Sequence, residues 1–150
     1  MMNIIARDAA TQRITRGVCR LLMDMGYCVL REFKLTSGRR VDVAGLDNKG
    51  HFVVVEVKSS LADFRSDEKW PEYLPYCDAF YFAVGPEFPA DILPEDQGVL
   101  VADGFGGVIR RPSEVYKMNG QRRKSQTIRF ARASAQRLES NLEKSQARTH

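Results

Sequence analysis

Residues 41–58 read VDVAGLDNKGHFVVVEVK, and the rest of the chain is organised around this segment. The pattern predicts two strands joined by a turn at residues 47–50, where Asp, Asn and Gly are typical turn formers. The second strand, residues 52–58, is an almost unbroken β-branched run, which is typical of a strand covered on both faces. Glu56 and Lys58 stand within that run, and the preceding strand carries Asp42 between two valines.

These three charged residues are expected to lie close together. Side chains alternate along a strand, so Glu56 and Lys58 project from the same face. Charged groups on interior strands are costly unless they are paired or bind a metal. One interpretation of Asp42, Glu56 and Lys58 is therefore a structural cluster of ion pairs.

The other interpretation is a functional site. Two carboxylates on adjacent strands can hold Mg²⁺ or Mn²⁺, with the main-chain carbonyl of Val57 as a further ligand. A bound metal lowers the pKa of its water and polarises a phosphate. Lys58 could orient the attacking water or stabilise charge that develops on the phosphate. The expected reaction is hydrolysis of a phosphodiester.

Length and composition are those of one soluble globular domain, with 150 residues, of which 43% are hydrophobic and 28% charged. No apolar run approaches the roughly 20 residues that a membrane span needs. The first residues lack the pattern of a signal peptide, so we expect a cytoplasmic protein without a membrane partner. Cys19, Cys28 and Cys77 form no Cys-x-x-Cys pair and are predicted to be buried free thiols.

Charge is distributed unevenly along the chain. Residues 110–150 contain 11 Lys/Arg and 3 Asp/Glu, whereas the rest contains 12 basic and 16 acidic residues. A basic segment behind a mildly acidic body indicates a polyanionic partner, DNA first, and a solvated charged tail is the alternative. We therefore predict a core domain over residues 1–111 and a basic, largely helical extension over residues 112–150. The candidate nucleic-acid contacts are Arg13, Arg16, Arg20, Arg39, Arg40, Arg122, Arg123 and Lys124.

The order of predicted elements indicates an α/β fold. A first helix, capped by Asp8 or Thr11, ends at Gly26. Three strands follow as an antiparallel meander over residues 27–35, 39–46 and 52–58. Ser60 and Asp63 resemble a capping box, which starts a crossover helix that should end near Trp70.

The second half of the chain completes a mixed sheet. Residues 79–84 are wholly apolar and should pair in parallel with residues 52–58 through the crossover helix. Shorter strands are predicted over residues 98–103 and 108–109. A C-terminal helix from about Gln121 carries an apolar stripe at helical spacing, made of Ile128, Ala131, Ala135, Leu138 and Leu142.

A resemblance to known proteins adds to this interpretation. Asp42, followed after thirteen residues by Glu56-Val57-Lys58, resembles the Asp … Asp/Glu-x-Lys motif of restriction-endonuclease-like nucleases, although Val41 stands where many of them have Pro. More narrowly, residues 17–101 resemble the MmcB-like bacterial DNA repair proteins. The matching blocks are GRRVD (38–42), VEVKSSLADF (55–64), KWPEY (69–73), YCD (76–78) and FYFAV (80–84).

The resemblance implies a restriction-endonuclease-like core, a role in DNA repair and two further candidate residues. Glu32, ten residues before Asp42, matches the extra acid that completes the metal site in many nucleases of this fold. Lys69, with Trp70 and Tyr73, matches a helix residue that faces the active site. The alternative is that Trp70 and Tyr73 belong to the core and that Lys69 is solvated.

Three functions follow as hypotheses. The first is a Mg²⁺- or Mn²⁺-dependent nuclease that acts in repair on damaged, branched or single-stranded DNA. The second is a non-catalytic DNA-binding or scaffold protein that retains the fold. In the third, the stripe from Ile128 to Leu142 docks a protein partner, with other DNA repair proteins as the candidates.

Overall fold

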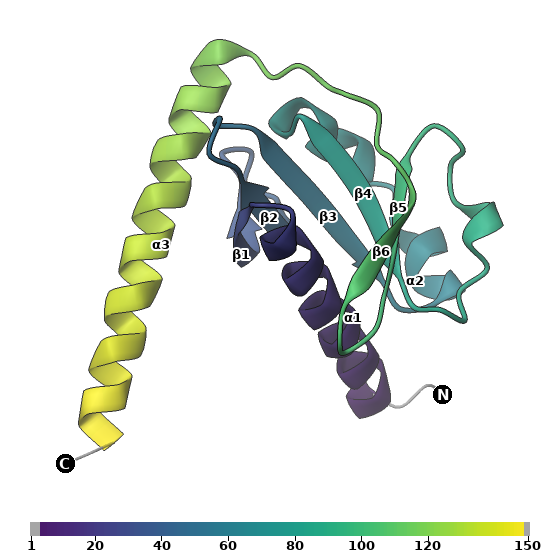
Figure 1. The fold of residues 1–150 in the computed structure, drawn as a ribbon, viewed down its shortest axis with the longest axis horizontal. Coiled ribbons are helices and arrows are strands. Elements are labelled where there is room, and N and C mark those ends of the chain that lie inside the picture. Colours follow the sequence, from purple (N-terminus) through teal and green to yellow (C-terminus); the bar gives the residue numbers. More distant parts are fainter. Residues whose placement is uncertain (1–3, 149–150) are drawn as a thin grey trace.

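The computed structural model describes the backbone of residues 4–148 and the side chains of residues 9–148. Its helices are α1 (Ile4–Asp24), α2 (Leu61–Ser66) and α3 (Gly120–Arg148), with 3₁₀ helices η1 (Trp70–Tyr76) and η2 (Ala90–Ile92). Its strands are β1 (Cys28–Lys34), β2 (Arg40–Leu46), β3 (Phe52–Lys58), β4 (Ala79–Val84), β5 (Gly98–Ala102) and β6 (Gly107–Arg111). The predicted α/β class is confirmed (Figure 1).

All the strands form one six-stranded sheet in the order β1-β2-β3-β4-β5-β6. The first three strands are the predicted antiparallel meander. β4 pairs in parallel with β3, and β5 pairs in parallel with β4, whereas β6 is antiparallel to β5. The chain therefore changes from hairpin connections to crossovers at β3, the strand that carries Glu56 and Lys58.

The two faces of the sheet have different covers, and alternation along β3 distributes its side chains between them. α1 packs on one face, where Val18 and Leu22 share a buried cluster with Val55 and Val57. On the other face, Phe52 and Val54 pack with residues of η1 and α3. Glu56 and Lys58 have the parity of Phe52 and Val54, so the candidate site lies on the face that α2, η1 and α3 share.

The first helix and one cysteine differ from the prediction. α1 begins at Ile4, so Asp8 and Thr11 lie inside the helix and neither is its cap. Gly26 ends this region as expected, with a left-handed φ of +96°. Cys19 and Cys77 are buried thiols, but Cys28 is exposed because it stands at the start of the edge strand β1.

The crossover also differs from the single predicted helix. Ser60 is the N-cap of α2, and its Oγ accepts a hydrogen bond from the Asp63 amide at 3.1 Å, as expected. The helix ends after Ser66, however, and η1 starts at Trp70 with Pro71 in its first turn. Pro71 therefore opens a second helix instead of closing the first, because proline is compatible with a first helical turn, where its missing N–H is not needed.

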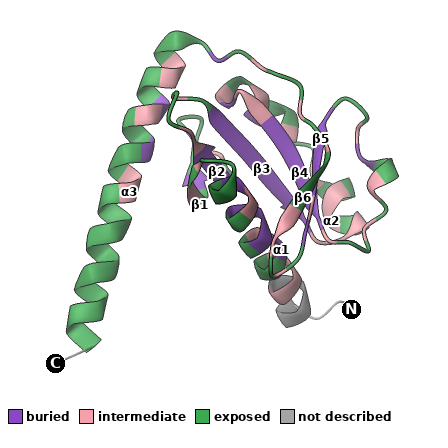
Figure 2. Cartoon of the chain, in the orientation of Figure 1, coloured by how far each residue is buried: buried purple, intermediate pink, exposed green. Residues whose placement is uncertain are grey.

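α3 is anchored by its first half, and its second half is exposed (Figure 2). Phe130 packs against Phe33 and Phe52 with ring centroids 5.6 and 5.9 Å apart. The predicted apolar stripe is not the packing face, because Ile128 and Leu138 are 51% and 62% exposed. The helix packs through the face that carries Gln126 and Phe130 instead.

Candidate active site

The centre of the candidate site is the point where β2 and β3 separate. Regular pairing between these strands ends at Val43 and Val55. Beyond that pair, the Asp42 amide donates a hydrogen bond to Glu56 Oε1 at 3.0 Å, and the Val57 amide donates to Asp42 Oδ2 at 2.7 Å. Each carboxylate thus satisfies a backbone amide of the neighbouring strand. The structure brings the two acids together and fixes the position of both.

Lys58 extends the site along the same face of β3. Its ammonium forms an ion pair with Asp67 Oδ2 at 2.6 Å, and the two side chains are only 7% and 11% exposed. Asp67 stands at the end of α2, and its Oδ1 accepts a hydrogen bond from the Lys69 amide at 2.8 Å. Asp67 is therefore held at both oxygens and positions the lysine.

Sequence reasoning missed Asp67 because it lay inside the helix predicted to run to Trp70. The helix stops one residue earlier, and this turns the Asp67 carboxylate back toward the end of β3. Two signals could have indicated the break. Ser66 and Asp67 are both residues that favour turns over helix interiors, and Pro71 disfavours a continuous helix through this segment.

Burial makes the two acids of the site unusual. The Glu56 side chain lies almost completely inside the protein, and burial raises its pKa to about 8, with the nearby charge of Asp42 as the second cause. Burial also raises the pKa of Asp42, against the opposing effects of the Val57 amide and the Lys58 charge. Burial disfavours the ionised forms of these two adjacent acids, and a divalent cation bound between them would stabilise those forms.

Tyr73 of η1 lies beside these charges. Burial raises the pKa of its phenol to about 12, and the negative charges of Glu56, Asp67 and Asp42 contribute in the same direction. The phenol therefore stays neutral at physiological pH and can serve only as a hydrogen-bonding or packing group. Tyr73 was expected either to face the site or to pack in the core, and it does both, because it is buried in the cluster that includes Phe80 and Phe82.

The donor set is compatible with magnesium. The described residues contain no ready group of three or more His, Cys, Asp or Glu side chains that could hold a metal. Asp42 and Glu56 each use one oxygen for a backbone amide, which leaves Oδ1 and Oε2 as possible ligands. Because Mg²⁺ is commonly bound by one or two carboxylates together with waters and substrate phosphate oxygens, this pair fits the ion. The Val57 carbonyl as a further ligand stays a prediction.

The two residues suggested by the resemblance alone lie apart from this centre. Glu32 stands opposite Asp42 between the paired residues of β1 and β2, but its φ of +51° interrupts the ladder there. Its side chain is exposed and forms no hydrogen bond or ion pair within residues 9–148. Lys69 is also exposed and contributes its amide to Asp67. Neither side chain contacts Asp42, Glu56 or Lys58 in the described structure.

Several of the predicted DNA-contacting arginines are used within the fold. Arg39 forms an ion pair with Glu72 at 3.2 Å. Arg122 stacks on the Tyr76 ring at 4.6 Å from its centroid, and Arg123 forms an ion pair with Asp78 at 2.6 Å. These contacts anchor the start of α3 and the β1–β2 turn to η1 and to Asp78, the residue before β4. Arg40 and Lys124 are exposed.

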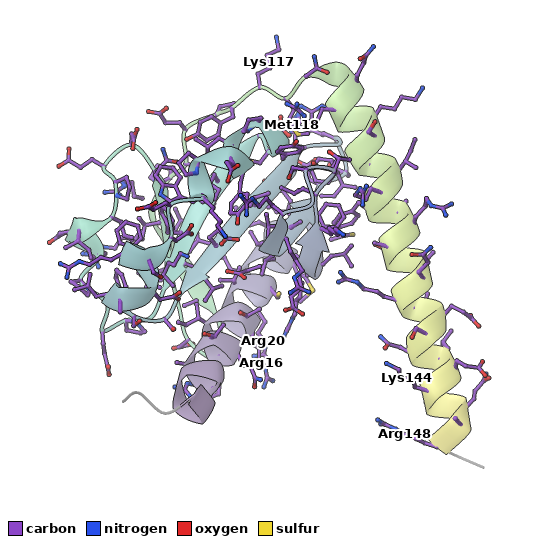
Figure 3. All side chains as sticks on the ribbon, turned by 180° about the vertical axis from the view of Figure 1, so that it is seen from behind. Arg16, Arg20, Lys117, Met118, Lys144 and Arg148 are labelled. Carbon is purple, nitrogen blue, oxygen red and sulfur yellow. The ribbon has the colours of Figure 1, made fainter. Side chains whose placement is uncertain are left out.

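The arginines of α1 lie on the other side of the sheet. Arg13 lines a cavity of about 440 Å³ at the ends of β3 and β4, together with Ser59, Gly85 and Asp103. Arg16 and Arg20 project from the surface of α1 (Figure 3), and Arg20 donates a hydrogen bond to the Phe105 carbonyl at 3.2 Å. Because α1 covers the face opposite Glu56 and Lys58, these residues do not border the two acids directly.

Comparisons with known proteins decide the family. A family model described as DNA repair protein MmcB-like matches residues 4–145. The chain belongs to the MmcB-like family of DNA repair proteins. The match extends beyond residues 17–101, where the sequence blocks were found, and includes most of α3. The family model therefore covers most of the basic helix α3 as well as the sheet.

Two solved structures resemble this MmcB-like chain. One is described as the SPO1766 protein of unknown function from Silicibacter pomeroyi; it is 44% identical, with a TM-score of 0.84, over 87% of this chain and 90% of that one. The other is a crystal structure of a repair endonuclease from Pyrococcus abyssi, 23% identical with a TM-score of 0.39, over 55% of this chain and 40% of that one. No curated protein matches the chain. None of the helices within residues 4–148 has the length and apolarity that a membrane span requires.

Proposed function

We propose that this MmcB-like protein hydrolyses phosphodiester bonds in damaged, branched or single-stranded DNA, with Mg²⁺ or Mn²⁺ as cofactor. One observation carries the proposal: Asp42 and Glu56 cap each other's strands at the point where β2 and β3 separate. Lys58 stands two residues beyond Glu56 on the same face. A purely structural cluster would not need two adjacent acids whose pKa values burial raises.

Each residue has a distinct role in this proposal. Asp42 and Glu56 would hold the cation, which when bound supplies an activated water and a polarised phosphate. Lys58 donates a hydrogen bond toward the water or a phosphate oxygen, where negative charge develops. Asp67 keeps the Lys58 ammonium oriented through the 2.6 Å ion pair. Tyr73 closes the site on the side of η1 and excludes bulk water.

The test is cleavage of single-stranded, duplex, forked and abasic DNA with Mg²⁺, Mn²⁺ or EDTA. We expect Asp42→Asn, Glu56→Gln and Lys58→Ala each to lower metal-dependent cleavage by at least about a hundredfold. DNA binding measured in EDTA should be nearly unchanged in Asp42→Asn. Cleavage that survives in all three purified variants, or that does not need a metal, would contradict the proposal.

A second function, DNA binding without cleavage, is favoured by a different observation. The Lys58 ammonium is occupied by Asp67 at 2.6 Å, and a lysine held in a buried pair can be purely structural. In that case the basic C-terminal segment would carry the activity, and binding should weaken steeply with salt because phosphate contacts release counterions. Binding with this salt dependence, together with no cleavage of any DNA and no metal binding, would identify this second function.

A further inference from the structure

The basic residues of α3 fall into two groups. Arg122, Arg123 and Arg137 attach the helix to the rest of the domain, the last by donating hydrogen bonds to the carbonyls of Arg31 and Glu32. Arg129 and Arg132 are exposed and form no hydrogen bond or ion pair with any part of the chain that the structure describes. These two guanidinium groups are therefore available to a ligand.

Arg129 and Arg132 line the same cavity. It has a volume of about 480 Å³, and its polar lining also includes Ser125 and Gln136 from α3 and Thr36 from the turn between β1 and β2. No carboxylate contributes to the lining. Two guanidinium groups with neighbouring hydroxyl and amide groups are donors suited to a phosphate, and arginine can bind phosphate oxygens through two parallel hydrogen bonds.

The cavity opens on the same side of the sheet as the candidate active site. Phe130, between the two arginines, packs on Phe33 and Phe52, whose face of the sheet also carries Glu56 and Lys58. Leu35 donates its amide to the Arg39 carbonyl at 2.8 Å, which places Thr36 beside Gly38 in the turn. Asp42 follows Thr36 by six residues, on the strand β2 that leaves this turn.

From this geometry we infer that the cavity between α3 and the β1–β2 turn binds a backbone phosphate of the DNA substrate, held by Arg129 and Arg132. The inference rests on the proposed function in so far as it takes DNA as the substrate. The bound strand would pass from this cavity toward Asp42 and Glu56, with α3 as one wall of its path.

The inferred phosphate ligands, Arg129 and Arg132, are not in the most basic run of the sequence. Arg122-Arg123-Lys124 has the higher charge density, but Arg122 and Arg123 are engaged with Tyr76 and Asp78. One to three helical turns further on, Arg129 and Arg132 are free of such contacts and stand beside the hairpin that carries Asp42. We therefore expect α3 to contact DNA through the two guanidinium groups that form no contact within the protein, and not through the segment of highest charge.

The test compares two double variants that remove the same charge. Arg129→Gln/Arg132→Gln changes the cavity, whereas Lys144→Gln/Arg148→Gln changes the exposed far end of α3 (Figure 3). Affinity for a labelled forked DNA is measured in EDTA between about 50 and 200 mM salt, the range over which phosphate contacts dominate the salt dependence. Circular dichroism and the midpoint of unfolding show that both variants are folded.

We expect the cavity variant to bind at least about tenfold more weakly at low salt, and the slope of log K against log salt to become shallower by about 0.9, the value for one lost phosphate contact. The control should change the slope by less than half as much. Arg129→Lys/Arg132→Lys should fall between wild type and the glutamine variant, because it keeps the charge and loses the bidentate geometry. Equal losses in the cavity variant and the control would overturn the inference.

The experiment separates this inference from the nuclease proposal. Binding in EDTA does not require cleavage, so the salt dependence of the cavity variant does not depend on the catalytic site. If Asp42→Asn cleaves like the wild type while the cavity variant loses binding, the proposed catalytic site is wrong and the phosphate pocket stands. If cleavage depends on Asp42 but the cavity variant binds like the wild type, the pocket is wrong and the nuclease stands.

Discussion

At the scale of single residues, the pair formed by Lys58 and Asp67 is the contact on which the candidate site depends most. Both side chains are nearly buried, so neither charge is stabilised by solvent. Removing one partner of such a pair leaves the other uncompensated, which is usually more costly than removing both. The pair therefore links the position of the lysine to the stability of the domain.

We predict that Asp67→Ala lowers the free energy of unfolding by about 3 kcal/mol or more, because it leaves the Lys58 ammonium buried without its carboxylate. The double variant Asp67→Ala/Lys58→Met should recover at least half of this loss. Urea unfolding of the two single variants and the double variant measures the coupling energy between Asp67 and Lys58. In cleavage assays, Asp67→Ala should lower kcat more than it raises KM, because Asp67 acts through Lys58. Strictly additive losses in the double variant would show that the ion pair contributes nothing specific.

At the scale of elements, α3 is an exposed helix attached through one aromatic side chain and several arginines. Phe130 is 5% exposed, and its ring meets Phe33 and Phe52 edge-on. The residues with the clearest helical periodicity, including Leu138 and Leu142, remain in solvent. This leaves the stripe from Ile128 to Leu142 free as a surface, and its role in docking a partner stays a prediction.

Phe130→Ala is expected to cost about 3 kcal/mol of stability, the usual loss for a buried phenylalanine, because it opens a cavity against β1 and β3. Leu138→Ala is the matched control on the same helix and should change stability by less than about 0.5 kcal/mol. Guanidinium unfolding followed by circular dichroism compares the two. A larger effect from Leu138→Ala would mean that the stripe, and not Phe130, anchors the helix.

At the scale of the whole molecule, the buried acids couple stability to pH. Folding raises the pKa of Glu56 from 4.5 to about 8, so the folded protein holds a proton that the unfolded chain releases at lower pH. The stability that this proton provides is complete below about pH 4.5 and is lost as the pH rises through 8. The contribution of Glu56 should therefore make the metal-free protein less stable at pH 8 than at pH 5.

Glu56→Gln should remove this pH dependence and make the metal-free protein more stable than wild type at pH 8, by on the order of 3 kcal/mol. Unfolding by urea in EDTA at several pH values between 5 and 9 is the measurement, with the exposed Glu68→Gln as control. A wild-type protein whose stability does not fall relative to Glu56→Gln over that range would contradict the assignment of the raised pKa to Glu56.

Magnesium should act on the same equilibrium in the opposite direction. A cation bound by Asp42 and Glu56 favours their ionised forms, so binding should release a proton near neutral pH and should tighten as pH rises. Mg²⁺ at about a hundred times its Kd should stabilise the wild type by about 2.7 kcal/mol, and EDTA should reverse this. Asp42→Asn and Glu56→Gln should show neither effect. Stabilisation that persists in both variants would place the metal elsewhere.

The sequence by itself determined those parts of this protein that depend on short-range pattern. The β-branched run at Phe52–Lys58 and the apolar run at Ala79–Val84 predicted β3 and β4 to the residue. Strand alternation placed Glu56 and Lys58 on one face, and the intervening turn placed Asp42 on the neighbouring strand. These predictions held because the pairing of a hairpin and the alternation along a strand are set by neighbouring residues.

Only the tertiary structure decided which groups meet beyond those short distances. Asp67 reaches Lys58 because α2 stops at Ser66. Arg122 and Arg123 contact Tyr76 and Asp78, whereas Arg129 and Arg132 form no such contact within the described residues. Phe130 displaced the more regular leucine stripe as the packing residue of α3 because it meets two phenylalanines of the sheet. Such contacts depend on where a helix ends and which face it turns inward, and long-range packing determines both.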